Sequence, residues 1–170
     1  MYDRNATARK KAVDKYCWNE SKGMYSDYHF VNKKVSDAVT LVGMFPLFVK
    51  LADKQRAEKQ KDVVMRDLLK PGGFVTSMFN NGQQWDAPNG WAPLEWVAIK
   101  GLRNYYFTEE ANTAADRWIK LNTDVYSRTG KMMEKYNVVD THLEAGGGEY
   151  PSQDGFGWTN GVLLALMNQR

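Results

Sequence analysis

The sequence predicts an all-α fold, with six helices joined by short connections on one side and two long loops on the other. Apolar residues recur at helical spacing along most of the 170-residue chain, and no strand–helix alternation or strong internal repeat is visible. Two stretches rich in tryptophan, proline or glycine fit no regular period. Long irregular stretches in a compact domain are usually functional or disordered, and this composition favours function. We expect residues 1–170 to form a single structural region that is not divided into domains.

The first half of the chain predicts three helices. Residues 4–18 form the first, with apolar and charged residues on opposite sides. A turn and an aromatic connection of no regular period follow. Residues 36–53 form the second, which Pro46 should kink because proline lacks the N–H that a helix interior uses. Residues 55–69 form an amphipathic third helix that ends before the segment 71–73, Pro-Gly-Gly.

The second half predicts three more helices. Pro93 begins the fourth, since proline is favourable in a first turn. Thr108 begins the fifth, because the two glutamates after it complement the helix dipole, and this helix stops by Gly130. Residues 140–158 read as a loop. Residues 162–167 are apolar all round, which predicts a last, buried helix.

Residues 83–93 combine two tryptophans, two prolines, an aspartate, amides and a glycine. No helix or strand period fits this mixture, so it predicts a rigid irregular loop. Flat rings beside fixed polar groups suit a sugar, which has one face of C–H groups and a rim of hydroxyls. We predict that Trp85 stacks on a sugar and that Asp86 and Gln84 hydrogen-bond to it. The alternative is that the loop tryptophans fill a core, as Trp118 on its helical face is expected to do.

This loop resembles a signature of the trehalases, the inverting glycosidases that split α,α-trehalose into two glucoses. The matching residues are QWDAPNGWAP (84–93), and a second match covers GGGEYP (146–151) and QDGFGWTNG (153–161). The resemblance runs over about residues 2–166 and covers only the C-terminal part of the family's catalytic domain. It implies part, about half, of an (α/α)6 barrel, two concentric rings of helices. It also implies trehalose or glucose as ligand and no metal or organic cofactor.

Glycoside hydrolysis normally needs two carboxyl groups, which in an inverting enzyme stand about 6.5–9.5 Å apart so that a water fits between. The residues alone do not rank the loop carboxylates, which are Asp86, Glu134, Asp140, Glu144, Glu149 and Asp154. The resemblance implies that Glu134 is the general base and that Glu149 holds a substrate hydroxyl. As alternatives, Glu134 pairs with Lys131 or Arg128, and Glu149 caps a loop amide.

The family's catalytic acid is an aspartate in an upstream segment that has no counterpart in this sequence. The chain therefore resembles a trehalase with its base and part of its pocket, but without its acid. We expect the 170-residue chain alone to be inactive, either as a truncated product or as one that assembles with the missing N-terminal part. Two other interpretations stay open: a helical module that binds a disaccharide without cleaving it, and an inactive trehalase fragment.

The composition narrows the classes of protein and the kinds of partner that remain. Hydrophobic residues make up 43% and charged residues 25%, as in globular proteins. The net charge of +3 is spread among acids, so we expect no nucleic-acid partner. The apolar run 39–49 is too short to span a bilayer, and we expect no membrane partner. The single Cys17 and two distant histidines predict no metal site. One cysteine and no signal peptide at Met1 slightly favour the cytoplasm over a periplasmic or secreted parent.

Overall fold

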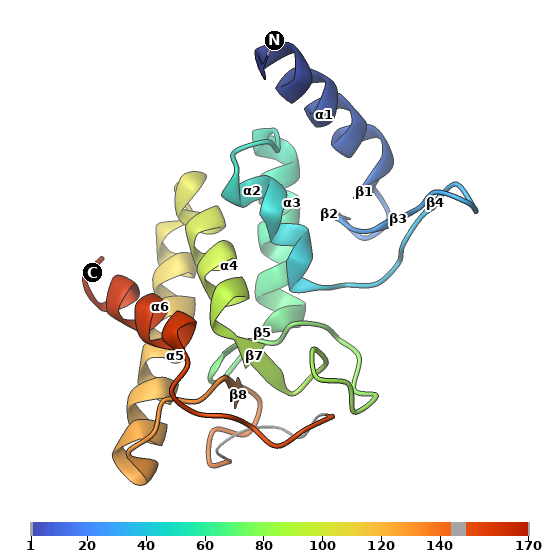
Figure 1. Cartoon of the computed structure of the whole chain (residues 1–170). Helices are drawn as coiled ribbons and strands as arrows, with labels where there is room; N and C mark the ends of the chain where they lie inside the picture. The colour runs from blue at the N-terminus through green and yellow to red at the C-terminus, as the bar shows by residue number, and fades with distance from the viewer. Residues whose placement is uncertain (1, 144–148, 170) are drawn as a thin grey trace.

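The computed structural model describes residues 2–143 and 149–169, and this part of the chain contains six α-helices and eight very short strands (Figure 1). The helices are α1 (Tyr2–Tyr16), α2 (Phe45–Phe48), α3 (Lys54–Val63), α4 (Ala92–Asn104), α5 (Thr108–Thr129) and α6 (Gly157–Met167). The strands pair antiparallel as β1 (Trp18–Asn19) with β2 (Met24–Tyr25), β3 (Tyr28–His29) with β4 (Lys34–Val35), β5 (Leu69–Lys70) with β6 (Gly73–Phe74), and β7 (Asn89–Trp91) with β8 (Lys135–Asn137). The predicted all-α class is confirmed, because pairs of two or three residues form no sheet layer.

The predicted second helix, residues 36–53, is wrong in length. A 3-10 turn, Leu41–Met44, leads into the single turn of α2, and the residues before it are extended. Leu41 N donates to Thr76 O at 2.8 Å, which holds this segment against a distant loop. Pro46 lies in the first turn of α2, where a missing N–H costs no helical hydrogen bond. The proline therefore starts a helix and does not kink one.

Most of the other predicted boundaries lie close to the observed ones, but the last helix begins at Gly157, before the predicted start at residue 162 and inside the stretch predicted to be a loop. The predicted helix 55–69 corresponds to α3 followed by a π-helical turn, Val64–Leu68. Pro93 lies in the first turn of α4. The fifth helix begins at Thr108 as predicted and ends at Gly130, whose φ of +69° suits glycine at a helix C-terminus. Local signals fix these ends, because a proline, an acidic first turn and a glycine each act within one turn.

Helix α4 is the centre of the helical body. It packs against α2, α5 and α6, and Figure 1 shows it between them. Trp118 of α5 is fully buried and meets the ring of Tyr136 edge to face, with centroids 5.3 Å apart. The buried residues of α4 are Ala92, Leu94, Glu95, Val97, Ala98, Ile99, Gly101 and Leu102. The core thus lies between α4 and α5 and extends to β8, at the end of the body where the predicted site loops meet.

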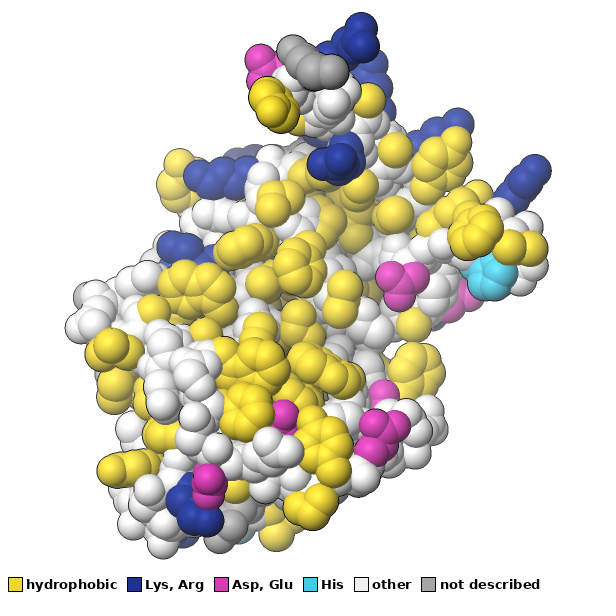
Figure 2. All heavy atoms as spheres, viewed as in Figure 1, with side chains coloured by type: hydrophobic (Ala, Val, Ile, Leu, Met, Phe, Trp, Pro, Cys, Tyr) yellow, Lys and Arg dark blue, Asp and Glu magenta, His cyan; other side chains and the backbone are white. Residues whose placement is uncertain are grey.

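Helix α6 is less buried than predicted from residues 162–167. Within it only Thr159 and Leu166 are buried, while Leu164 is 62% exposed and Met167 44% exposed. The helix packs on α4 and α5 along one side, so its apolar residues on the other side face outward. Figure 2 shows hydrophobic side chains exposed across the face of the molecule that carries α2, α4 and α6.

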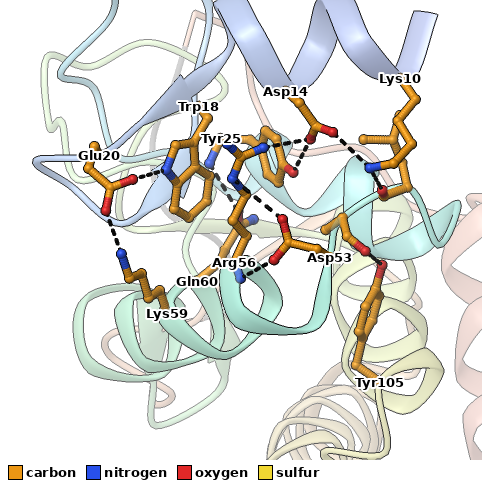
Figure 3. A network of polar contacts seen from close by, with 12 residues as sticks. Lys10, Asp14, Trp18, Glu20, Tyr25, Asp53, Arg56, Lys59, Gln60 and Tyr105 are labelled. Carbon is orange, nitrogen blue, oxygen red and sulfur yellow. Dashed lines mark hydrogen bonds and ion pairs between the residues drawn. The ribbon is translucent and has the colours of Figure 1, made fainter. Parts of the chain in front are cut away.

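Helix α1 projects from the body and has no buried residue (Figure 1). A polar network holds it (Figure 3). Asp14 accepts hydrogen bonds from Lys10 Nζ and Tyr25 OH, both at 2.7 Å, and pairs with Arg56 at 2.9 Å. Lys10 Nζ also donates to Leu51 O at 2.6 Å. Burial raises the pKa of Asp14, but the hydrogen bonds from Lys10 and Tyr25 outweigh it, so the net pKa is lowered.

Glu95 of α4 is a fully buried acid beneath the site loops. Phe74 N donates to its Oε1 at 2.6 Å, and its Oε2 has no hydrogen-bond partner among the described residues. Gly73, with a φ of +134°, lets the backbone approach this closely, since a Cβ there would lie 2.6 Å from Oε1. Burial raises the pKa of Glu95 well above its ordinary value, and the Phe74 N–H opposes only part of this rise.

Glu95→Gln should remove a pH dependence of the free energy of unfolding. A group whose pKa is raised by folding contributes stability that is fully present below its ordinary pKa, 4.5, and is lost as the pH rises through its folded pKa. Thermal unfolding over a pH series should therefore show wild-type stability falling across that window more steeply than in the variant. Glu58→Gln, on the exposed side of α3, is the control and should keep the wild-type slope. Equal slopes for wild type and Glu95→Gln would contradict this account.

Candidate active site

The pairing of β7 with β8 brings the two loop regions together. Trp91 lies opposite Lys135, and Gly90 lies opposite Tyr136. Side chains of directly opposed residues stand on the same face of the pair. The tryptophan-rich stretch 83–93 is thereby fixed beside Glu134, which immediately precedes β8. Lys135–Asn137, which the sequence left ambiguous or unassigned, is thus the strand that joins the two halves of the site.

The loop tryptophans form an aromatic stack. Trp85 is 44% exposed and lies flat on Trp91, with ring centroids 3.9 Å apart and planes 11° apart. Trp91 is buried, and its Nε1 donates to Gln84 O at 3.2 Å. Trp158 of α6 meets the edge of Trp91 at 5.9 Å. Trp91 thus fills a core, as the alternative predicted, whereas Trp85 has an exposed face backed by Trp91, and its stacking on a sugar stays a prediction.

Gln84 and Asp86 occupy the same loop but have different neighbours. Gln84 is buried, and its Oε1 accepts from the backbone N–H of Glu149 at 3.0 Å, which ties the two predicted site loops together. Asp86 turns to its own loop. Its Oδ1 accepts from Ser77 Oγ at 3.2 Å and its Oδ2 from Asn81 N at 3.1 Å. The carboxylate of Asp86 therefore braces the loop that carries Trp85.

Glu134 is held by a short strand-like pairing that the sequence did not reveal. Its N–H donates to Gln153 O at 2.8 Å, and the neighbouring residues Met133 and Asp154 form an isolated antiparallel bridge. Asp154 also pairs with Lys131 at 2.7 Å. These contacts fix the backbone on which Glu134 stands.

The carboxylate of Glu134 is enclosed but not fully bonded. The residue is 4% exposed, and its Oε1 accepts from Tyr150 OH at 3.1 Å. Its Oε2 has no hydrogen-bond partner within the described part of the chain. The nearest recorded cation is Lys135 Nζ, 3.9 Å from Oε2. Partial burial and the Glu134 carboxylate raise the pKa of Tyr150, so its hydroxyl stays a donor at neutral pH.

Sequence reasoning missed Lys135 and Tyr150. The side chain of Lys135 is fully buried, and its Nζ lies 4.9 Å from the ring centroid of Tyr150 and 5.8 Å from that of Trp91. Burial lowers the pKa of Lys135, and the Glu134 carboxylate offsets part of this lowering. The only available signal was adjacency to Glu134, since lysine is ordinarily expected on the surface.

Glu149 is exposed, and the contact recorded for it is the backbone bond to Gln84. The glycines 146–148 of the second trehalase-like segment lie outside the described residues, as does the candidate Glu144. In residues 2–143 and 149–169 no group of three potential ligands could hold a metal ion. None of the helices described there is long and apolar enough to cross a membrane.

The chain has the fold of one part of the helical barrel that is found in glycosidases. The structure of neutral trehalase Nth1 from Saccharomyces cerevisiae is similar, with a TM-score of 0.86 and 27% identity over 100% of this chain and 30% of that one. A GH63 mannosylglycerate hydrolase from Thermus thermophilus shares the fold, with a TM-score of 0.67 and 23% identity over 95% of this chain and 38% of that one. The expected partial helical barrel is confirmed.

The trehalase family model matches residues 1–170, and the chain belongs to this family. The periplasmic trehalase of Salmonella newport is 47% identical over 168 residues, which are 99% of this chain and 30% of that protein. The enzyme of the same name from Salmonella dublin is 47% identical over 167 residues, or 98% and 29%. The chain thus spans about 30% of the length of these relatives. Because they are named periplasmic, the comparison does not support the cytoplasmic preference.

Trp118→Ala should destabilise the protein more than Trp85→Ala. Truncating a buried tryptophan costs about 3–5 kcal/mol, whereas Trp85 is partly exposed and its loss leaves Trp91 in place. The free energy of unfolding of both variants, measured by denaturant titration, checks this difference. A larger loss in Trp85→Ala would overturn the division of the tryptophans into core and site.

Proposed function

We propose that this chain provides the general base and part of the sugar pocket of an inverting α,α-trehalase, with Glu134 as the base. The observation that carries the proposal is the state of Glu134, whose carboxylate is enclosed, held at Oε1 by Tyr150 and without a hydrogen bond at Oε2 among the described residues. A general base needs an unoccupied lone pair at a fixed position. Family membership and the relatives' names supply the substrate class.

In the proposed reaction Glu134 Oε2 accepts a proton from water. The oxygen of that water attacks the anomeric carbon of one glucose unit while the bond to the bridging oxygen breaks. An acid on the opposite side protonates the departing oxygen, and the single displacement inverts the configuration. This chain has no counterpart of the family's acid motif, so the acid belongs to a segment equivalent to the N-terminal part of the relatives.

The aromatic stack and its neighbours form the proposed sugar pocket. The open face of Trp85 is backed by Trp91, so a pyranose ring can stack on it without displacing a core residue. Gln84 holds the backbone of Glu149 next to this loop, which suits the proposed role of Glu149 in binding a substrate hydroxyl. Asp86 is also proposed to hydrogen-bond to the sugar, through the acceptor capacity that its bonds from Ser77 and Asn81 leave unused.

Glu134→Gln should lower kcat by ~10²–10⁴-fold with little change in KM, because an amide cannot take a proton from water. We would measure this in a chimeric Salmonella newport periplasmic trehalase in which residues 1–170 replace the matching segment. The unmutated chimera should release glucose from trehalose, and the 170-residue chain alone should not. Glu58→Gln is the surface control. A Glu134→Gln chimera with more than about a tenth of the parent kcat would eliminate Glu134 as the base.

Glu149→Ala in the same chimera should lower kcat/KM for trehalose by about 10–150-fold, with most of the change in KM. This range corresponds to the ~1.5–3 kcal/mol of a hydrogen bond that involves a charged group. Glu109→Ala, in the first turn of α5, offers an exposed acid remote in sequence as the control. Unchanged kinetics in Glu149→Ala would show that this carboxylate does not contact the substrate.

The exposed Trp85 also favours a second candidate, a module that binds a disaccharide without cleaving it. Tryptophan fluorescence of the 170-residue chain, titrated with trehalose, distinguishes the two functions. A saturable change that is lost in Trp85→Ala but kept in Trp96→Ala, in a chain whose chimera is inactive, would favour the binding module. Trp96 is the control because it is half-buried on α4.

A further inference from the structure

Lys135 presents an unusual charged group beside the proposed base. Its side chain is fully buried, and its Nζ has no hydrogen-bond partner among the residues that the structure describes. Burying a charge is costly unless another charge or a hydrogen bond compensates for it. The compensating charge is Glu134, whose Oε2 lies 3.9 Å from Nζ, and the rings of Tyr150 and Trp91 face the ammonium from two other segments.

The 3.9 Å separation between these atoms matters for what the pair can do. A hydrogen-bonded ion pair, with N and O about 2.7–2.9 Å apart, would occupy a lone pair of the carboxylate. At the longer distance the ammonium attracts the negative charge but leaves Oε2 without a hydrogen bond. Because Lys135 is also enclosed by rings, it acts on Glu134 and does not offer its own N–H groups to a sugar.

Few other titratable groups face this pair. From the loop after residue 148, Tyr150 donates its hydroxyl to Glu134 Oε1, and the charge of Glu149 acts on Tyr150. From β7 the neighbour is the uncharged ring of Trp91. In the preceding segment Lys131 pairs with Asp154 at 2.7 Å. Among the described residues, Lys135 is thus the buried cation that lies next to Glu134 Oε2.

We propose that Lys135 is a positioning residue, whose buried ammonium balances the charge of the Glu134 carboxylate and keeps Oε2 directed toward the attacking water. This inference rests on the proposed role of Glu134 as the general base. It adds a specific task for Lys135, since the charge of a carboxylate in an enclosed site is costly unless an opposite charge or a hydrogen bond compensates for it.

The test is the pH dependence of trehalose hydrolysis by the chimera that carries residues 1–170. Lys135→Met keeps the length of the stem and removes the charge. Removing a neighbouring positive charge makes a carboxylate harder to ionise, so the acid limb of kcat/KM should move to higher pH. Activity lost near the parent's acid limb should be regained as the pH is raised. Lys135→Arg, which restores a cation, should restore the acid limb.

Two controls separate this role from a structural one. Lys120→Met removes an exposed cation on α5, which pairs with Asp124, and should leave the acid limb in place. Lys135→Gln is a second neutral variant for use if the methionine variant does not fold, and thermal melting reports folding in each case. A merely structural lysine would lower the melting temperature and depress activity equally at every pH.

The outcomes distinguish this inference from the function on which it rests. If Glu134→Gln abolishes turnover and the neutral Lys135 variants shift the acid limb, the proposed function and the role of Lys135 are both supported. If Glu134→Gln abolishes turnover but folded neutral Lys135 variants keep the parent's acid limb, Lys135 is not a positioning residue and the proposed function is unaffected. If Glu134→Gln retains turnover, the proposed function fails and this inference falls with it.

Discussion

The candidate site depends on one main-chain interaction, the antiparallel pairing of β7 with β8. Three residue pairs join segments more than forty positions apart, and each segment carries half of the site. The pairing sets Trp91 opposite Lys135 and places Glu134 at the end of the strand. Main-chain hydrogen bonds suit this task because they position side chains on both segments without using them. The exposed face of Trp85 and Glu134 Oε2 are thus not used in joining the two segments.

The helical frame could be predicted from the sequence where local chemistry decides the structure. The first-turn proline of α4, the acidic first turn of α5 and Gly130 at its end each act within a few residues. The segment around Pro46 could not be predicted in the same way, because a contact with Thr76 holds the preceding residues extended. Strands of two residues could not be predicted either, since they are too short to show an alternation of apolar and polar residues.

The site was predictable in its residue types but not in its connections. The tryptophan-rich stretch and Glu134 are conspicuous in the sequence, and the resemblance to trehalases ranked Glu134 and Glu149 above the other acids. The bond from Tyr150 to Glu134 and the enclosure of Lys135 depend on segments that meet only in three dimensions. A buried lysine also contradicts the usual distribution of charged residues, so composition argues against it until a compensating charge is seen.

The attachment of α1 has a consequence for the dynamics of the protein. This helix buries no residue fully, and polar contacts centred on Asp14, together with the partly buried Val13, join it to the body. Partly exposed charge pairs are weakened by salt, whereas the packing of α4 against α5 is not. Local opening of α1 should therefore need far less free energy than global unfolding, and its amide hydrogens should exchange with solvent before those of the core. The docked population of this helix should also fall as the ionic strength rises.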